Sequence, residues 1–113
     1  MCRYRNNYIE INGNRYDFEF DIRTVVQHQN NYIVLLCIPF NETEINNVYC
    51  LDSQANLVWR SEDLRTRFPE SENWLPYEQM GILDGTIFAS DFYGRNFKIS
   101  ASNGRIEGFD VVK

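Results

Sequence analysis

Two stretches of this chain repeat one pattern at a fixed offset, and each has the form of a β-hairpin. Residues 48–60 and 96–108 align without a gap, and each contains a strand-like run, a four-residue polar turn and a second strand-like run. In the first copy Tyr49 precedes Leu51 by two positions, and the second copy has an aromatic and an aliphatic residue in the same places. Because side chains two apart share one face of a strand, the repeat predicts hairpins and an all-β protein.

Further turn signals divide the rest of the chain into short strands. Asn-Gly or Asp-Gly pairs at 12–13, 84–85 and 103–104 supply the positive φ angles of tight hairpin turns. After the first pair, residues 15–22 alternate apolar and acidic side chains, which predicts one strand with a buried face and a solvated face. About ten short strands are expected, and the last third of the chain forms a meander.

One run is expected to lie at the centre of the fold. Residues 32–38 are apolar without alternation, which indicates a strand covered on both faces, and Pro39 ends it. We therefore predict a single β domain over residues 1–113, built as a bent antiparallel sheet, a two-layer sandwich or a roll, with at most one short helix.

The β pattern stops between residues 61 and 76. Ser61 is a suitable N-cap, and Pro69 limits any helix there to about two turns, so we expect an irregular connection with a short helix near 61–67. A loop of this length is unusual in a small domain, which makes it a candidate functional segment.

Charge and hydropathy exclude several classes of partner. The chain has 16 acidic and 11 basic residues, and its net charge of −5 disfavours binding to nucleic acid and favours a basic partner. The longest apolar stretch, residues 32–40, is too short to span a bilayer, and no apolar run follows the basic N-terminal residues as it would in a signal peptide. We expect a cytoplasmic protein without membrane contacts.

Neither catalysis nor metal binding has a recognisable set of residues. The single histidine, His28, lies in a polar turn, and alternation explains Asp17, Glu19 and Asp21 as a solvated strand face. Asp52 is expected to bond the backbone of its own turn. The chain is therefore predicted to be no enzyme and to carry no cofactor or metal. Its three cysteines, Cys2, Cys37 and Cys50, indicate neither a disulfide framework nor a zinc site. A Cys37–Cys50 disulfide stays open if their strands are neighbours.

The first repeated hairpin resembles the strand-turn-strand unit of quinoprotein-type β-propeller blades. In that unit an apolar strand ending in Leu-Asp turns into a strand ending in Trp, as Leu51-Asp52 and Trp59 do here. Asn56 stands where the unit usually has Gly. The length of the chain excludes a whole propeller, so this resemblance implies local geometry and no quinone cofactor.

The layout of the whole chain resembles small acidic bacterial proteins that include immunity proteins of contact-dependent and other polymorphic toxin systems. It has an N-terminal Asn-Gly hairpin, an apolar strand ending near Pro39, a hairpin with the pattern Val-Tyr-x-Leu-Asp…Val-Trp, a loop, and a closing meander. The resemblance implies tight binding to a cognate toxin, often a nuclease, whose active site the immunity protein blocks.

We therefore predict a non-enzymatic immunity protein that binds a basic toxin domain through the loop at 61–76. The acids are expected to set the association rate and the tryptophan to contribute affinity, although Trp74 has an equal alternative as a lid on the core. The predicted contact residues are Glu62, Asp63, Glu70, Glu72 and Trp74.

Two alternatives stay open. A structural or self-assembling β module would pair its free strand edges with another chain. An enzyme using carboxylates alone would need a deep cleft with two facing acids. The oligomeric state and the strand order do not follow from the sequence.

Overall fold

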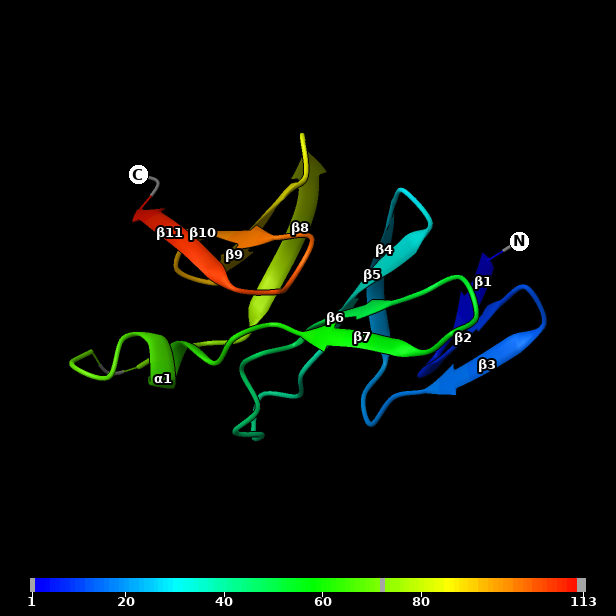
Figure 1. The fold of residues 1–113 in the computed structure, drawn as a ribbon. Helices are drawn as coiled ribbons and strands as arrows, with labels where there is room; N and C mark the ends of the chain where they lie inside the picture. The colour runs from blue at the N-terminus through cyan, green and yellow to red at the C-terminus, as the bar shows by residue number, and fades with distance from the viewer. Residues whose placement is uncertain (1, 72, 112–113) are drawn as a thin grey trace.

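The computed structural model is all-β, and it consists of three antiparallel sheets that follow one another along the chain (Figure 1). It describes residues 2–71 and 73–111, the last three of these by their backbone only. Eleven strands and one short helix lie in this part of the chain. The predicted all-β hairpin architecture with one short helix is confirmed. The strands form three sheets, where the sequence predicted a bent sheet, a two-layer sandwich or a roll.

Each sheet is an up-and-down meander of consecutive strands. The first sheet contains β1 (Cys2–Arg5), β2 (Tyr8–Ile11) and β3 (Asn14–Asp17). The middle sheet contains β4 (Ile22–His28), β5 (Asn31–Leu36), β6 (Val48–Leu51) and β7 (Leu57–Arg60). Helix α1 (Leu64–Arg67) precedes the third sheet, which contains β8 (Tyr77–Leu83), β9 (Thr86–Asp91), β10 (Arg95–Ser100) and β11 (Ile106–Val111).

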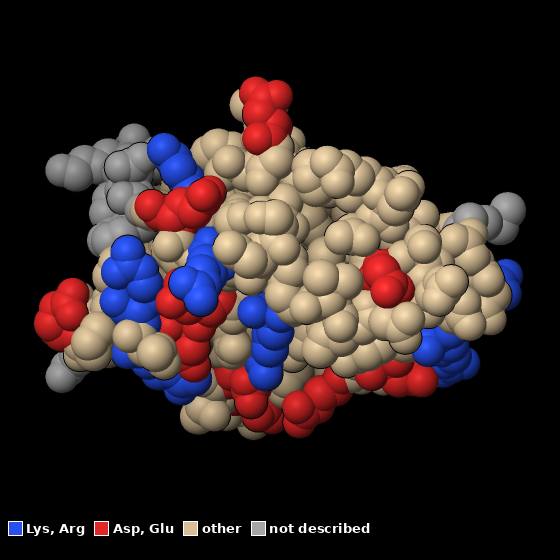
Figure 2. All heavy atoms as spheres, in the orientation of Figure 1, with Lys and Arg blue, Asp and Glu red and all other residues tan. Residues whose placement is uncertain are grey.

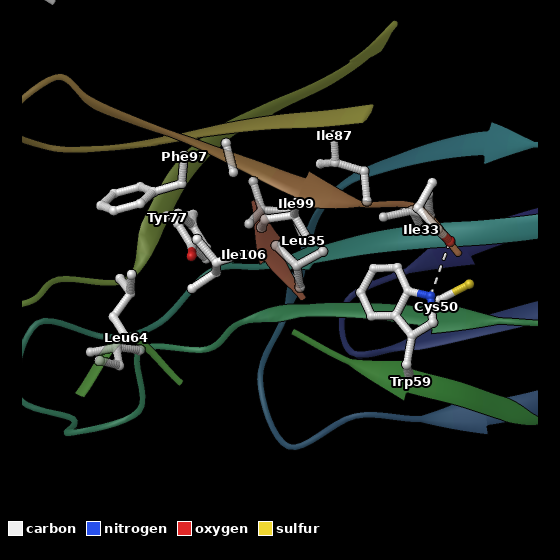
Figure 3. Close-up of a cluster of buried hydrophobic side chains, with 14 residues drawn as sticks. Ile33, Leu35, Cys50, Trp59, Leu64, Tyr77, Ile87, Phe97, Ile99 and Ile106 are labelled. Atoms are coloured by element: carbon white, nitrogen blue, oxygen red, sulfur yellow. Dashed lines mark hydrogen bonds between the residues drawn. The ribbon is translucent and has the colours of Figure 1, made fainter. Parts of the chain in front are cut away.

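Strand β5 lies at the centre, as its unbroken apolar sequence predicts. Ile33 and Leu35 face the third sheet, in a core cluster that also holds Phe97 and Ile99 (Figure 3). The intervening side chains of β5 face the first sheet and pack with Ile9 and its neighbours. A strand that is covered on both faces by successive layers has no solvated side, so its sequence does not alternate.

The prediction of one strand over residues 15–22 is wrong. Strand β3 ends at Asp17 and β4 begins at Ile22, so the chain crosses from the first sheet to the middle sheet between them. Phe18 is still buried, but its backbone N–H donates to Asn7 O at 2.7 Å, in a turn that follows β1. The apolar alternation marks side chains that pack into the core and does not require that their backbone pairs in a sheet.

The two repeated hairpins are confirmed as β6–β7 and β10–β11, and their turns carry the contacts between sheets. Trp59 of the middle sheet donates its indole Nε1–H to Ala101 O in the third sheet, with the two atoms 3.1 Å apart (Figure 3). Asn12 of the first sheet donates its side-chain N–H to Ser53 O in the middle sheet at 3.0 Å. Ser53 and Ala101 are both the sixth residue of their repeat. The same turn carbonyl therefore accepts a bond from the preceding sheet in both copies.

A buried amide forms a further connection between the middle and third sheets. Asn47 is fully buried, and its Nδ2 donates to Leu36 O at 2.7 Å and to Tyr77 O at 2.9 Å. Its Oδ1 accepts from the backbone N–H of Tyr77 at 2.9 Å. One side chain thus satisfies three backbone groups at the end of β5 and the start of β8.

Tyr77 carries a hydroxyl that has no hydrogen-bond partner among the described residues, although its ring is 1% exposed. Burial raises the pKa of this phenol, so it stays protonated and neutral. We expect Tyr77→Phe to leave the free energy of unfolding unchanged or to raise it by up to about 1 kcal/mol, because the variant removes an unpaid desolvation cost. Urea denaturation measures this. A loss above about 1 kcal/mol would show that the hydroxyl has a bound partner.

Candidate functional site

One surface concavity of the described residues is a groove of about 670 Å³. Three segments form its walls: residues 38–45 before β6, residues 74–78 at the start of β8, and residues 92–93 in the turn between β9 and β10. Arg65 of helix α1 completes the lining. The groove therefore lies where the middle sheet, the link at 61–76 and the third sheet meet.

Exposed aromatic side chains surround this groove, and we call Phe40, Phe92 and Tyr93 the aromatic rim. Phe40 is fully exposed, and Phe92 and Tyr93 are 78% and 65% exposed. All three line the groove. Single exposed apolar residues are ordinary, but several around one concavity are typical of an interaction site.

A buried carboxylate holds the two rim residues of the β9–β10 turn in place. Asp91 Oδ1 accepts from the backbone N–H of Tyr93 at 2.9 Å and from that of Arg95 at 3.1 Å. Its Oδ2 accepts from Arg95 Nε at 2.6 Å. Gly94, at a φ of 81°, completes the reversal. The turn is therefore fixed by internal bonds, and Phe92 and Tyr93 project from it into solvent.

Trp74 forms part of the groove wall and also closes the end of the core. Its ring centroid lies 5.6 Å from that of Phe68 and 5.9 Å from that of Phe97, and its Nε1 donates to Phe68 O at 3.4 Å. The guanidinium of Arg95 lies 4.8 Å from its ring centroid. Of the two predicted alternatives, the structure shows the lid, and one part of the same side chain remains at the groove.

Acidic and basic side chains at the groove are mostly paired. Glu78 binds Arg23 at 3.0 Å, and Arg65 binds Asp63 at 2.8 Å. Glu42 is exposed and makes no ion pair within the described residues. Figure 2 shows acidic side chains along the lower edge of the molecule, where the loop between β5 and β6 lies in Figure 1.

The structure separates the predicted contact residues, and of those that it describes only Trp74 lines the groove. Glu62 accepts a bond from the backbone N–H of Ile106 at 3.0 Å, so it joins the link to the third sheet. Asp63 caps helix α1, Glu70 is exposed beyond that helix, and Glu72 lies outside the described residues. The sequence analysis did not predict the aromatic rim. The feature that could have indicated it is the position of these aromatic residues in turns, outside the strand alternation.

The predicted N-cap is wrong by two residues. Ser61 is 2% exposed and its hydroxyl has no partner among the described residues, whereas Asp63 Oδ1 accepts from Arg65 N at 2.8 Å. The backbone N–H of Ser61 bonds Val48 O at 2.8 Å, which keeps this residue in the extended path after β7. The helix therefore begins later than its sequence signals suggest.

Asp63→Ala is expected to lower the free energy of unfolding by about 1 kcal/mol at pH 7 through loss of the cap. Bonds from the Arg65 side chain, and then from its backbone N–H, hold the pKa of Asp63 below its usual 3.8. A carboxyl group whose pKa is lower in the folded state stabilises the folded protein at pH values above the pKa of the unfolded state. This stabilisation is lost as the pH falls through the folded-state pKa.

Denaturation at several pH values tests this prediction. The difference between the wild type and Asp63→Ala should shrink below pH 3.8. Asp63→Asn is the matched control, because it keeps a capping oxygen without the charge and should lose less at pH 7. A difference that is independent of pH would contradict the role of the carboxylate.

The remaining polar candidates have structural roles. Asp52 Oδ1 accepts from the backbone N–H groups of Gln54 and Asn56, both at 2.9 Å, which confirms the predicted turn bonding and lowers the pKa of Asp52. Cys2, Cys37 and Cys50 are free thiols. Within the described residues, no group of three His, Cys, Asp or Glu side chains could hold a metal ion. The described part of the chain also has no helix that is long and apolar enough to cross a bilayer.

Fold and site together define an all-β protein of three stacked antiparallel meanders with an aromatic-rimmed surface groove. The chain belongs to the family described as Domain of unknown function (DUF7957), which matches residues 1–111. A comparison with curated proteins finds no match.

Proposed function

We propose that this chain is a non-enzymatic immunity protein that binds and neutralises a cognate toxin domain. The observation that supports this proposal is the aromatic rim, because aromatic anchors beside a pocket dominate the affinity of protein interfaces. A turn already fixed by Asp91 presents two of these residues, so little order has to be gained on binding.

Charge supports a basic partner. The net charge of −5 attracts a basic surface over distance and raises the association rate, while short-range contacts at the groove set the dissociation rate. A basic nuclease domain acting inside the cell fits this charge, and with such a partner we propose a cytoplasmic location for the chain.

Co-purification with the toxin domain encoded beside this chain tests the proposal, together with growth protection when both are expressed. The chain should bind the toxin and protect the cell. A joint Phe40→Ser, Phe92→Ser and Tyr93→Ser variant should lose both properties. Leu83→Ser is the matched control, since Leu83 is 65% exposed and lies outside the groove. No binding by the wild type, or full protection by the triple variant, would contradict the proposal.

The same assay tests the contact residues expected from the sequence. Charge reversal at Glu70 and Glu72 together with Trp74→Ala should weaken binding and reduce its salt dependence if the link at 61–76 also meets the partner. Unchanged binding would exclude Glu70, Glu72 and Trp74 from the interface.

A second candidate function is self-assembly through strand edges. Strand β7 is an edge of the middle sheet, and its consecutive Leu57 and Val58 are each 47% exposed. An exposed apolar edge can pair with another strand. Light scattering of the wild type and of Val58→Lys distinguishes this function, because a stable oligomer would be dispersed by the charge.

A further inference from the structure

We infer that the groove is a slot for an arginine side chain on the partner, which stacks on the aromatic rim and pairs with Glu42. This inference rests on the proposed function and identifies the chemistry by which the partner is recognised. It follows from the aromatic faces at the groove, from its charge and from its size.

The aromatic wall already binds a guanidinium within the chain. Arg95 lies 4.8 Å from the ring centroid of Trp74 and 5.6 Å from that of Tyr93. Both rings also line the groove, where Phe40 and Phe92 add two exposed faces. A guanidinium over an aromatic face is attracted by the ring quadrupole and also stacks with it, which a compact ammonium does less well.

The charge at the groove favours a cation. Arg65 is neutralised by Asp63, and Glu78 is neutralised by Arg23, so these groups together contribute no net charge. Glu42 lines the groove without an ion pair among the described residues. An acidic partner side chain would be repelled by Glu42, and a purely apolar one would leave this carboxylate without a counter-charge.

The size of the groove suits a side chain and the backbone that carries it. Its volume of about 670 Å³ lies within the range of about 300–1,000 Å³ that is typical of sites for small ligands. The aromatic rim comes from two separate loops that both line the groove, so both loops can contact an arginine that a partner loop inserts.

Nuclear magnetic resonance with an octa-arginine peptide as the probe tests the slot on the full chain. The two indole Nε1–H signals provide an internal comparison, because Trp74 lines the groove whereas Trp59 is buried and bonded to Ala101. Trp74→Phe assigns the signals. The Trp74 signal should move with added peptide and the Trp59 signal should not, while octa-glutamate should move neither.

Variants separate the slot from general attraction between charges. Glu42→Gln and Phe92→Ser should each weaken octa-arginine binding by about tenfold. Glu19→Gln is the matched control for charge, because Glu19 is exposed and lies outside the groove, and it should bind as the wild type does. Octa-lysine should bind more weakly than octa-arginine at the same ionic strength.

Three results would overturn the slot. They are an unmoved Trp74 signal, equal effects of Glu42→Gln and Glu19→Gln, and a Trp74 shift that depends on protein concentration without peptide, which would indicate a second copy in the groove. The two proposals fail separately. If Glu42→Gln and Phe92→Ser both keep toxin protection, the slot is overturned and the immunity function stands. If the chain binds arginine but gives no protection, the immunity function is overturned and the slot stands.

Discussion

Gly104→Ala is expected to lower the free energy of unfolding by about 2 to 4 kcal/mol, because the substitution combines backbone strain with overpacking. Gly104 has a φ of +76°, a conformation that costs an alanine about 1 kcal/mol. An added Cβ would lie 2.5 Å from Cε3 and 2.8 Å from Cδ2 of Trp59, and 3.2 Å from Arg60 O. The ring cannot retreat easily, since its Nε1 is bonded to Ala101 O and its other side is in the core.

Gly85→Ala is the matched control for this prediction. Gly85 has nearly the same φ, +77°, but its added Cβ would meet only His28 Cε1, at an ordinary 3.9 Å. It should therefore show the strain alone, about 1 kcal/mol. Urea denaturation of the two variants measures the difference. Equal losses would mean that Trp59 does not press on Gly104 in solution.

The contact between Trp59 and Gly104 also explains why the repeated hairpins differ in sequence. Gly104 is the ninth residue of its repeat, and Asn56 occupies the same place in the other copy. The middle sheet packs the indole of Trp59 against the turn of the second copy, which leaves no room for a Cβ at Gly104. The first sheet docks on the first turn with the short side chain of Asn12, and Asn56 is exposed there. Gly104 also has a positive φ, which Asn56 does not have, so both the backbone and the ring favour glycine in the second copy.

Local patterns predicted the hairpins because turn chemistry and strand alternation act within a few residues. The Asp-Gly turn at 84–85 has φ angles of 51° and 77°, as the dipeptide requires. The unbroken apolar sequence of β5 likewise predicted that both faces of this strand are covered. The division into three sheets depends on where the backbone leaves one sheet for the next, and residues 18–21 keep the same alternation through that crossing.

The candidate site depends on tertiary placement, which the sequence pattern does not contain. Phe40 follows an apolar strand and Tyr93 precedes a turn glycine, and these turn positions do not show that the two side chains line the same groove. Glu62 and Asp63 were predicted as contact residues, but the structure gives both of them internal bonds. Both are acidic residues in a long loop, yet each is bonded within the protein. Exposure of a side chain is decided by the segments that surround it.

Asn47→Ala is expected to lower the free energy of unfolding by about 3 to 5 kcal/mol. The substitution leaves three backbone groups buried without a partner: the carbonyls of Leu36 and Tyr77, and the N–H of Tyr77. Each such group costs about 1–3 kcal/mol, and water entering the space left by the amide reduces the total.

Asn46→Ala is the neighbouring control, because Asn46 is partly buried and its Nδ2 makes one long bond, to Ser61 O at 3.3 Å. It should lose less than about 1 kcal/mol. Amide hydrogen exchange of Tyr77 locates the effect, since its N–H should lose protection in Asn47→Ala and keep it in Asn46→Ala. If both variants lost the same stability, the seam between the middle and third sheets would depend on apolar packing alone. The predicted difference instead makes Asn47 a polar tie that fixes where β8 begins, and with it the position of the groove wall at residues 74–78.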